Sequence, residues 1–278
     1  EKGTVAEHLS EPRGAIVGDA VRLMQFDARC VGNHDFAHSL PVASAYTHDD
    51  HALVLCSNVT PAAGSVLSPS WDAVPFGVIE VGELRVGFFA LVSRPWDEMQ
   101  TQPDSLQFYS EALTNAWDFA DIARSVVAAH RDDVDLLVHL SHLGLADDEA
   151  LCAEVGGIDV VLGGHSHSTL REVRTVNGAT IIHCGAEGEF AGVLELEVRR
   201  GVVGAEPRCR VLRYELRPTA EQPVHAPTES ALRRLLDRSA PGWGDDLCAA
   251  PGDGRIEAVS DFTARALLAR QADAVLLD

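Results

Sequence analysis

Three short apolar segments, each followed by small residues and a histidine, constrain the fold of this 278-residue chain more than any other feature. The residues that follow them are Gly32-Asn33-His34, Ser141-His142 and Gly163-Gly164-His165-Ser166-His167. Short apolar runs of this kind are typical of strands buried on both faces. Stretches with helical spacing alternate with them, at Gly14–Gln25, Trp117–His130 and Asp147–Val155. This alternation predicts an α/β domain with both faces of its sheet covered.

The other segments predict a sheet of mixed direction. Val78–Val81 and Leu84–Leu91 flank Gly82-Glu83 as the two arms of a β-hairpin do. Three later strand segments follow one another without helices, at Thr180–His183, Val193–Arg199 and Arg208–Leu216. Parallel neighbours need a long crossover connection, so strands without one are expected to pair antiparallel.

Charge and composition exclude several classes of function. The chain has 22 Lys and Arg against 42 Asp and Glu, a formal charge of −20, so we expect no nucleic-acid polymer as a partner. A small anionic substrate would need local help from metal ions against this field. No apolar run reaches the ~18 residues of a membrane helix, so no membrane span is expected. The six cysteines form no Cys-x-x-Cys pair, which argues against a thiolate zinc knuckle.

The histidines after the three strands predict a metal site. Loops at the carboxyl ends of strands in α/β sheets converge on one edge, where ligands bind. A lone histidine after a strand, such as His142, is as readily a structural residue as a ligand. His165 and His167 carry more weight, because positions i and i+2 after Gly-Gly can face one site. Imidazole and amide oxygen, the latter from Asn33, suit zinc, manganese, iron or cobalt.

The remaining histidines are read as structural or solvated residues. Those in polar or surface segments are His8, His38, His48, His51, His130 and His225, and those within strands are His139 and His183.

The motifs resemble those of the calcineurin-like metallophosphoesterases, in the branch of 5′-nucleotidases and 2′,3′-cyclic-nucleotide phosphodiesterases. The resemblance runs from about Gly14 to Val198 and rests on four motifs, Gly32-Asn33-His34-Asp35-Phe36, Ser57-Asn58-Val59, Leu140-Ser141-His142-Leu143-Gly144 and Gly163-Gly164-His165-Ser166-His167. It implies a four-layer αββα sandwich with two divalent metal ions at the strand ends. It also implies hydrolysis of phosphate esters, above all of nucleotides, by a metal-activated water. Family members are often exported or periplasmic, and the compartment of this chain stays open.

The same resemblance implies a role for each site residue. Asn33, His142 and His165 would hold the second metal, and His167 would reach the first. His34 would be catalytic, touching the phosphate and stabilising charge on the transferring group. Residues that bind the rest of the substrate cannot be named, and neither can the oligomeric state.

The sequence departs from the family in its first metal-binding motifs. No Asp-x-His precedes Asn33, and the Gly18-Asp19 pair lies inside a predicted helix only 14 positions before Asn33. Ala37 stands where the branch has an aspartate that orients the catalytic histidine, and Asp35 is a poor substitute because adjacent residues face differently. Whether the chain is an enzyme therefore stays open. The alternatives are a non-catalytic fragment that binds one metal or none, and a related sulfur-ester hydrolase.

The expected domain organisation follows from these motifs and from a change in composition after Arg217. Residues 1–217 are expected to form a metallophosphoesterase domain that lacks its first metal-binding motifs. Residues 218–254 would form a linker and a helix, and residues 255–278 the beginning of an incomplete C-terminal nucleotidase domain of α/β type. The chain is accordingly expected to be truncated at both ends.

Overall fold

A computed structural model describes residues 15–36, 47–62, 71–93, 113–115, 117–200 and 208–239. Its centre is a six-stranded sheet of order β4-β5-β7-β8-β10-β9. The strands are β4 (Phe76–Val81), β5 (Leu84–Val92), β7 (Leu136–His142), β8 (Val160–Gly163), β10 (Ala179–His183) and β9 (Arg174–Val176). The four inner strands run parallel, and β4 and β9 join the two edges antiparallel. The expected α/β fold with a mixed sheet is confirmed.

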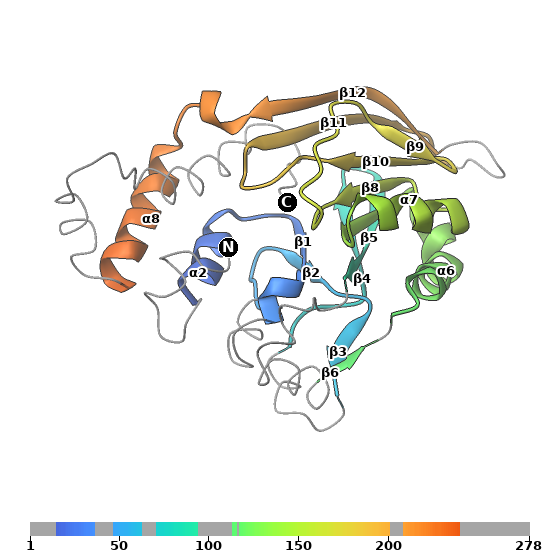
Figure 1. Ribbon diagram of the computed structural model, residues 1–278, viewed down its shortest axis with the longest axis horizontal. Helices are drawn as coiled ribbons and strands as arrows, with labels where there is room; N and C mark the ends of the chain where they lie inside the picture. Colours follow the sequence, from blue (N-terminus) through green and yellow to red (C-terminus); the bar gives the residue numbers. More distant parts are fainter. Residues whose placement is uncertain are drawn as a thin grey trace.

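Two helices cover one face of this sheet. They are α6 (Phe119–His130), which Asp118 caps by accepting a hydrogen bond from the Asp121 amide, and α7 (Leu145–Glu154). Both lie on the same side of the sheet in Figure 1. Phe89, Leu137 and Ile181 of the sheet pack with Ala123 of α6 and Cys152 of α7 in the larger buried cluster. Burial of this apolar surface is the main force that holds the two helices on the sheet.

A second layer of strands covers the other face. It consists of the parallel pair β1 (Ala28–Cys30) and β2 (Leu53–Leu55) and the antiparallel pair β11 (Phe190–Val198) and β12 (Cys209–Pro218). Leu55 of this layer, together with Leu194 and Leu196, packs on Ala90 and Leu140 of the six-stranded sheet. Among the described residues the two pairs are separate sheets.

The helices α2 (Ala15–Leu23) and α8 (Ala226–Ser239) lie beyond this layer, on the side away from α6 and α7 (Figure 1). They pack on each other through two small clusters, Met24 with Leu232 and Ile16 with Leu235. The order of layers is thus helices, sheet, strands, helices. Within the described part of the chain, no helix is both long enough and apolar enough to cross a membrane.

Several details differ from the sequence expectation. The strand β7 continues through Ser141 and His142 instead of ending at Leu140, so His142 is the last residue of a strand. The helix α8 begins at Ala226, early in the segment 218–254 that was expected to form a linker and a helix, with Pro227 in its first turn, where a proline costs no hydrogen bond. Three short strands were not predicted, β3 (Val59–Pro61), β6 (Leu113–Asn115) and β9. The described residues also contain three short 3-10 helices, η1 (Asn33–Phe36), η2 (Arg131–Asp133) and η3 (Thr219–Glu221).

Ala37 and residues 240–278, including the segment expected to open a second domain, lie outside the described residues.

Candidate metal centre

The structure brings three of the predicted ligands together from two strand layers. Asn33 begins η1 just after β1, His142 ends β7, and His165 follows β8. The Nε2 atom of His142 lies 2.8 Å from Oδ1 of Asn33, although the two residues are 109 positions apart. The rings of His142 and His165 are tilted against each other with centroids 4.9 Å apart. Whether these side chains bind a metal stays a prediction.

Backbone geometry explains why the turn before Asn33 needs glycine. A Cβ atom on Gly32 would come within 3.2 Å of Cε1 and Nε2 of His142. Few Cβ atoms approach a neighbour this closely, so a larger residue would push the imidazole away from Asn33. The close approach of β1 to the end of β7 thus sets the distance between these two candidate ligands.

The loop after β8 holds its two histidines in an uncommon backbone conformation. His165 has φ 72° and His167 has φ 55°, in the left-handed region that non-glycine residues seldom adopt. Hydrogen bonds fix the loop between them, because the Ser166 amide donates to the Gly164 carbonyl and Ser166 Oγ accepts from the Leu145 amide. Strained residues of this kind cluster at functional sites, where the surrounding structure over-determines them.

Burial keeps the two central imidazoles neutral. The pKa of His142 is lowered to about 3, chiefly by burial and then by the neighbouring His165, His34 and His167 in that order. The pKa of His165 is lowered by burial and by His167, while Asp147 and Asp148 act in the opposite direction. His34 and His167 are exposed, yet both lie within electrostatic range of His142. A neutral imidazole is the form that coordinates a metal ion.

The described residues do not form a complete metal site by themselves. No group of three or more His, Cys, Asp and Glu side chains among them stands close enough to hold an ion. Asn33 and His142 nevertheless fit adjacent positions around one cation, because donor atoms bound at about 2.1 Å and at right angles lie about 3 Å apart. The donor set of amide oxygen and imidazole suits a transition metal but contains no carboxylate.

Asp19 and Asp35, the two acidic residues that the sequence analysis considered for the site, have other partners in the structure. Asp19 is half exposed on α2 and forms an ion pair with Arg22, as expected of a helical surface residue. Asp35 turns its carboxylate back to accept a hydrogen bond from the Gly32 amide at 2.8 Å. Burial raises the pKa of Asp35. Its carboxylate therefore closes the turn that presents Asn33.

One other histidine differs from the sequence interpretation, and another has a partner that the sequence did not reveal. His130 was expected at the solvated surface, but its ring stacks on Phe76 with centroids 3.8 Å apart. His183 lies in a strand, as expected, and it is fully buried with Nε2 at 2.8 Å from the carboxylate of Asp148. The sequence did contain a signal for this pair, because His183 ends an apolar strand segment and Asp148 lies in a predicted helix upstream of it.

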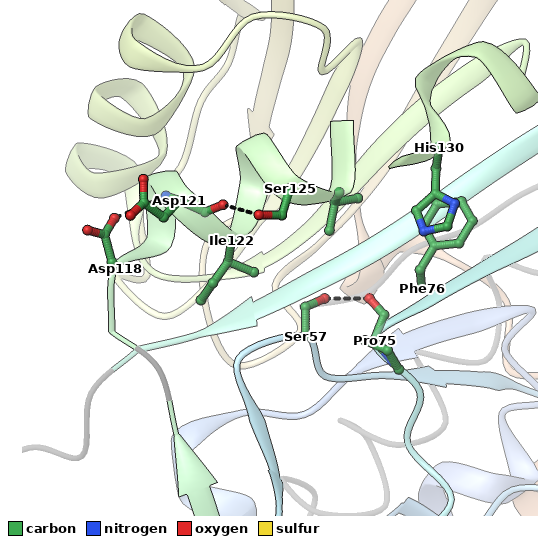
Figure 2. A pocket seen from close by; sticks show the side chains of 9 residues that line it. Ser57, Pro75, Phe76, Asp118, Asp121, Ile122, Ser125 and His130 are labelled. Atoms are coloured by element: carbon green, nitrogen blue, oxygen red, sulfur yellow. Dashed lines mark hydrogen bonds between the residues drawn. The ribbon is translucent and has the colours of Figure 1, made fainter. Parts of the chain in front are cut away.

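A surface cavity lies apart from the candidate ligands. It has a volume of about 440 Å³ and lies between α6 and the start of β4, lined by Ser57, Pro75, Phe76, Asp118, Asp121, Ile122, Ser125, Val126 and His130. Figure 2 shows Ile122 and Ser125 of α6 facing Ser57 and Pro75, with the stacked pair of His130 and Phe76 beyond them. It contains none of the predicted ligands.

Comparison with known proteins identifies a family and several relatives that match part of the chain. The profile of a family described as "Calcineurin-like phosphoesterase" matches residues 17–169, more than half of the chain. The uncharacterized metallophosphoesterase YunD of Bacillus subtilis is 26% identical over 65% of this chain and 37% of its own length. Human 5′-nucleotidase is 24% identical over 57% of this chain and 26% of its own length. The chain thus spans well under half of the curated relatives that it matches here.

A solved structure agrees with the fold. The 5′-nucleotidase precursor from Thermus thermophilus superposes with a TM-score of 0.64 at 21% identity, covering 82% of this chain and 47% of that one.

Proposed function

The chain belongs to the calcineurin-like phosphoesterase family, and from this we propose that it is part of a metal-dependent hydrolase of phosphate esters that acts on nucleotides as 5′-nucleotidases do. The observation that carries the proposal is the meeting of Asn33, His142 and His165 at the ends of β1, β7 and β8. The relatives named 5′-nucleotidase support the substrate class.

Each residue of the proposed site has a distinct task. Asn33, His142 and His165 would hold one divalent cation, of manganese, zinc, iron or cobalt, and His167 would face a second. Bound cations would supply Lewis acidity and neutralise charge on the phosphate. His34, exposed beside Asn33, would hold a proton and stabilise negative charge on the phosphate oxygens. His142 stays neutral because it is buried, so its lone pair is available for coordination.

The proposal includes a domain organisation for the chain. Residues 1–217 would form the metallophosphoesterase domain, residues 218–254 a linker with a helix, and residues 255–278 the start of a nucleotidase domain. The ligands described so far are neutral, and a dinuclear site is expected to need carboxylates to balance its charge. We propose that these carboxylates come from outside the described residues, either in the same polypeptide or in a partner chain.

Metal content and activity, measured together, test the proposal. The chain is loaded with Mn²⁺ or Zn²⁺, the ions per chain are counted, and hydrolysis of a nucleoside monophosphate is assayed. We expect bound metal, and any turnover is expected to disappear in His142→Ala while the exposed His51→Ala variant matches the parent chain. Cyclic nucleotides and a thiosulfate ester (an S-sulfonate) serve as comparison substrates. Equal metal binding by the His142→Ala variant and the parent chain would refute the assigned ligands.

A second candidate function is metal binding without catalysis. The observation that favours it is the lack of a carboxylate-containing metal group among the described residues. It predicts at most one ion per chain and no hydrolysis of any of these substrates. Turnover that depends on His142 would exclude it.

A further inference from the structure

A buried polar network of Ser141, Asp148 and His183 lies next to the candidate metal ligands, since Ser141 directly precedes His142. Ser141, Gly163 and His183 are register neighbours across the ends of β7, β8 and β10. Asp148 reaches this row from α7, accepting hydrogen bonds from Ser141 Oγ on one oxygen and from His183 Nε2 on the other, the latter at 2.8 Å. Asp148 and the His183 side chain are fully buried, and Ser141 is 2% exposed. The carboxylate of Asp148 therefore links β7 and β10, the strands on either side of β8.

The network continues into the two segments that carry the ligands. Ser141 Oγ also accepts a hydrogen bond from the Leu143 amide, which fixes the backbone on both sides of His142. The Ser141 carbonyl accepts one from the Gly164 amide, the residue just before His165. Ser141 thus connects Asp148 to the backbone beside His142 and beside His165.

The absence of a side chain on Gly163 makes room for the network. A Cβ atom at this position would lie 2.1 Å from Nε2 of His183 and 2.6 Å from Oδ2 of Asp148, distances at which neither atom could stay. The glycine at the end of β8 is therefore required for the Asp148–His183 pair. This requirement is separate from the turn that the following Gly164 makes.

A serine, a histidine and an aspartate in contact do not form a hydrolytic triad here. Ser141 Oγ is bonded to the carboxylate and not to the imidazole, and the group is sealed from solvent. A substrate could not reach the hydroxyl, so a role in covalent catalysis is excluded. Taking a carboxylate out of water is costly, and a buried carboxylate with its hydrogen-bond partners usually contributes less to stability than apolar residues of the same size would. A stabilising role alone is thus a poor reason for placing a carboxylate at this position.

We propose that Asp148 is a positioning residue for the candidate metal centre, which locks the strand ends that carry His142 and His165 and places a negative charge behind ligands that have none. The inference rests on the proposed function for the presence of a metal, and on the hydrogen bonds for the positioning. Partners behind metal ligands commonly change metal affinity 10- to 100-fold when they are removed.

The test compares two buried aspartates in the metal-binding chain. Asp148→Asn keeps the shape of the side chain and removes its charge. Asp159→Asn is the matched control, because Asp159 is also buried and hydrogen-bonded, but lies at the opposite end of β8. Titration with Mn²⁺ or Co²⁺, followed by calorimetry, is expected to show at least about tenfold weaker binding for Asp148→Asn. Binding by Asp159→Asn is expected to stay within about twofold of the parent chain. Equal affinities in both variants would overturn the proposal.

A second measurement does not need the metal. Side-chain ¹⁵N resonances of the histidines in the metal-free chain report the environment and tautomer of each imidazole. Asp148→Asn is expected to shift the resonances of His142 and His165 as well as those of His183, whereas Asp159→Asn leaves all three in place. If the parent chain binds no metal, the proposed function fails while these spectra still decide the positioning role. Unchanged His142 and His165 resonances would refute that role even in a chain that binds metal.

Ser141→Ala provides an independent variant if Asp148→Asn does not fold. It removes the hydroxyl that connects the carboxylate to the ligand segments and leaves the Asp148–His183 pair intact. The expected result is a shift of the His142 resonances and weaker metal binding, with the His183 resonances unchanged. Parent-like metal affinity and an unchanged His142 in this variant would likewise overturn the proposal.

Discussion

His139 is a polar residue in an apolar part of the core. It lies fully buried in β7 with its ring stacked on Phe89, the centroids 4.5 Å apart. Neither ring nitrogen has a hydrogen-bond partner among the residues that the structure describes. Burial lowers the pKa of His139 to about 4, although the nearby charge of Asp148 opposes the shift. The folded protein therefore holds this ring neutral at pH values where an exposed histidine would be protonated.

This burial makes the stability of the protein depend on pH. Between the unfolded pKa of about 6.5 and the folded pKa of about 4, the unfolded chain binds a proton that the folded chain refuses, so stability falls as the pH falls. Between pH 7.5 and pH 4.5 the loss from His139 is expected to be about 2.5 kcal/mol. Urea denaturation at both pH values measures it.

The variant His139→Leu isolates this contribution. Leucine has a similar volume and does not titrate, so the variant is expected to lose about 2.5 kcal/mol less than the parent between the two pH values. Whatever pH dependence is left belongs to other groups, such as His142. An identical loss in parent and variant would show that His139 is not held neutral.

At the scale of single residues, the sequence predicted the placement of the ligand candidates but not their support. Asn33, His142 and His165 follow strands, and the ends of strands meet at one edge of the fold whatever the details of packing. The Asp148–His183 pair could not be predicted in this way. Its partners become neighbours only through the register of three strands and the position of α7, and no local pattern encodes that register.

Between elements, a second buried network joins the opposite end of the sheet. Arg131, at the start of η2, forms an ion pair at 2.8 Å with Asp159, which precedes β8 and accepts a hydrogen bond from the Leu137 amide of β7. Arg208, just before β12, donates to the carbonyls of Arg131 and Val134. The network thus connects the end of α6 and both strand layers.

Breaking this network is expected to destabilise the fold as a whole. Both side chains of the Arg131–Asp159 pair are nearly buried, so Asp159→Ala would leave a guanidinium without its counter-ion and the Leu137 amide without its acceptor. We expect a loss of about 3 kcal/mol in the free energy of unfolding, measured by urea denaturation. The exposed pair of Asp121 and Arg124 is the control, and Asp121→Ala should cost less than about 1 kcal/mol. Similar losses in the two variants would contradict this account.

The longer elements could be predicted from the sequence, whereas three of the three-residue strands could not. The hairpin of β4 and β5 has clear apolar runs around Gly82-Glu83, and α6 has several turns of amphipathic spacing. The strands β3, β6 and β9 have three residues each, too few for an alternation to be recognised. Their pairing comes from tertiary contacts, as when Asn58 bonds both the amide and the carbonyl of Val92 and so fixes the start of β3.

For the molecule as a whole, the candidate centre lies where two layers meet. Asn33 belongs to the layer of β1 and β2, whereas His142 and His165 belong to the six-stranded sheet. The formal charge of −20 opposes the approach of a phosphate ester, so a cation at this position would serve both to join the layers and to offset the field around the substrate. Binding to the folded state alone also raises stability, in proportion to the logarithm of the ligand concentration.

Metal binding should therefore slow backbone opening in both layers at once. With saturating Mn²⁺, hydrogen exchange followed by mass spectrometry is expected to show added protection in residues 28–36 as well as at the ends of β7 and β8, because an ion held by Asn33, His142 and His165 resists separation of the layers. The helix α8, which packs on α2 and carries no candidate ligand, should exchange at an unchanged rate and serves as the internal control. His142→Ala should abolish the added protection throughout. Protection confined to β7 and β8 would mean that Asn33 is not a ligand, and that its 2.8 Å contact with His142 is only a hydrogen bond between the layers.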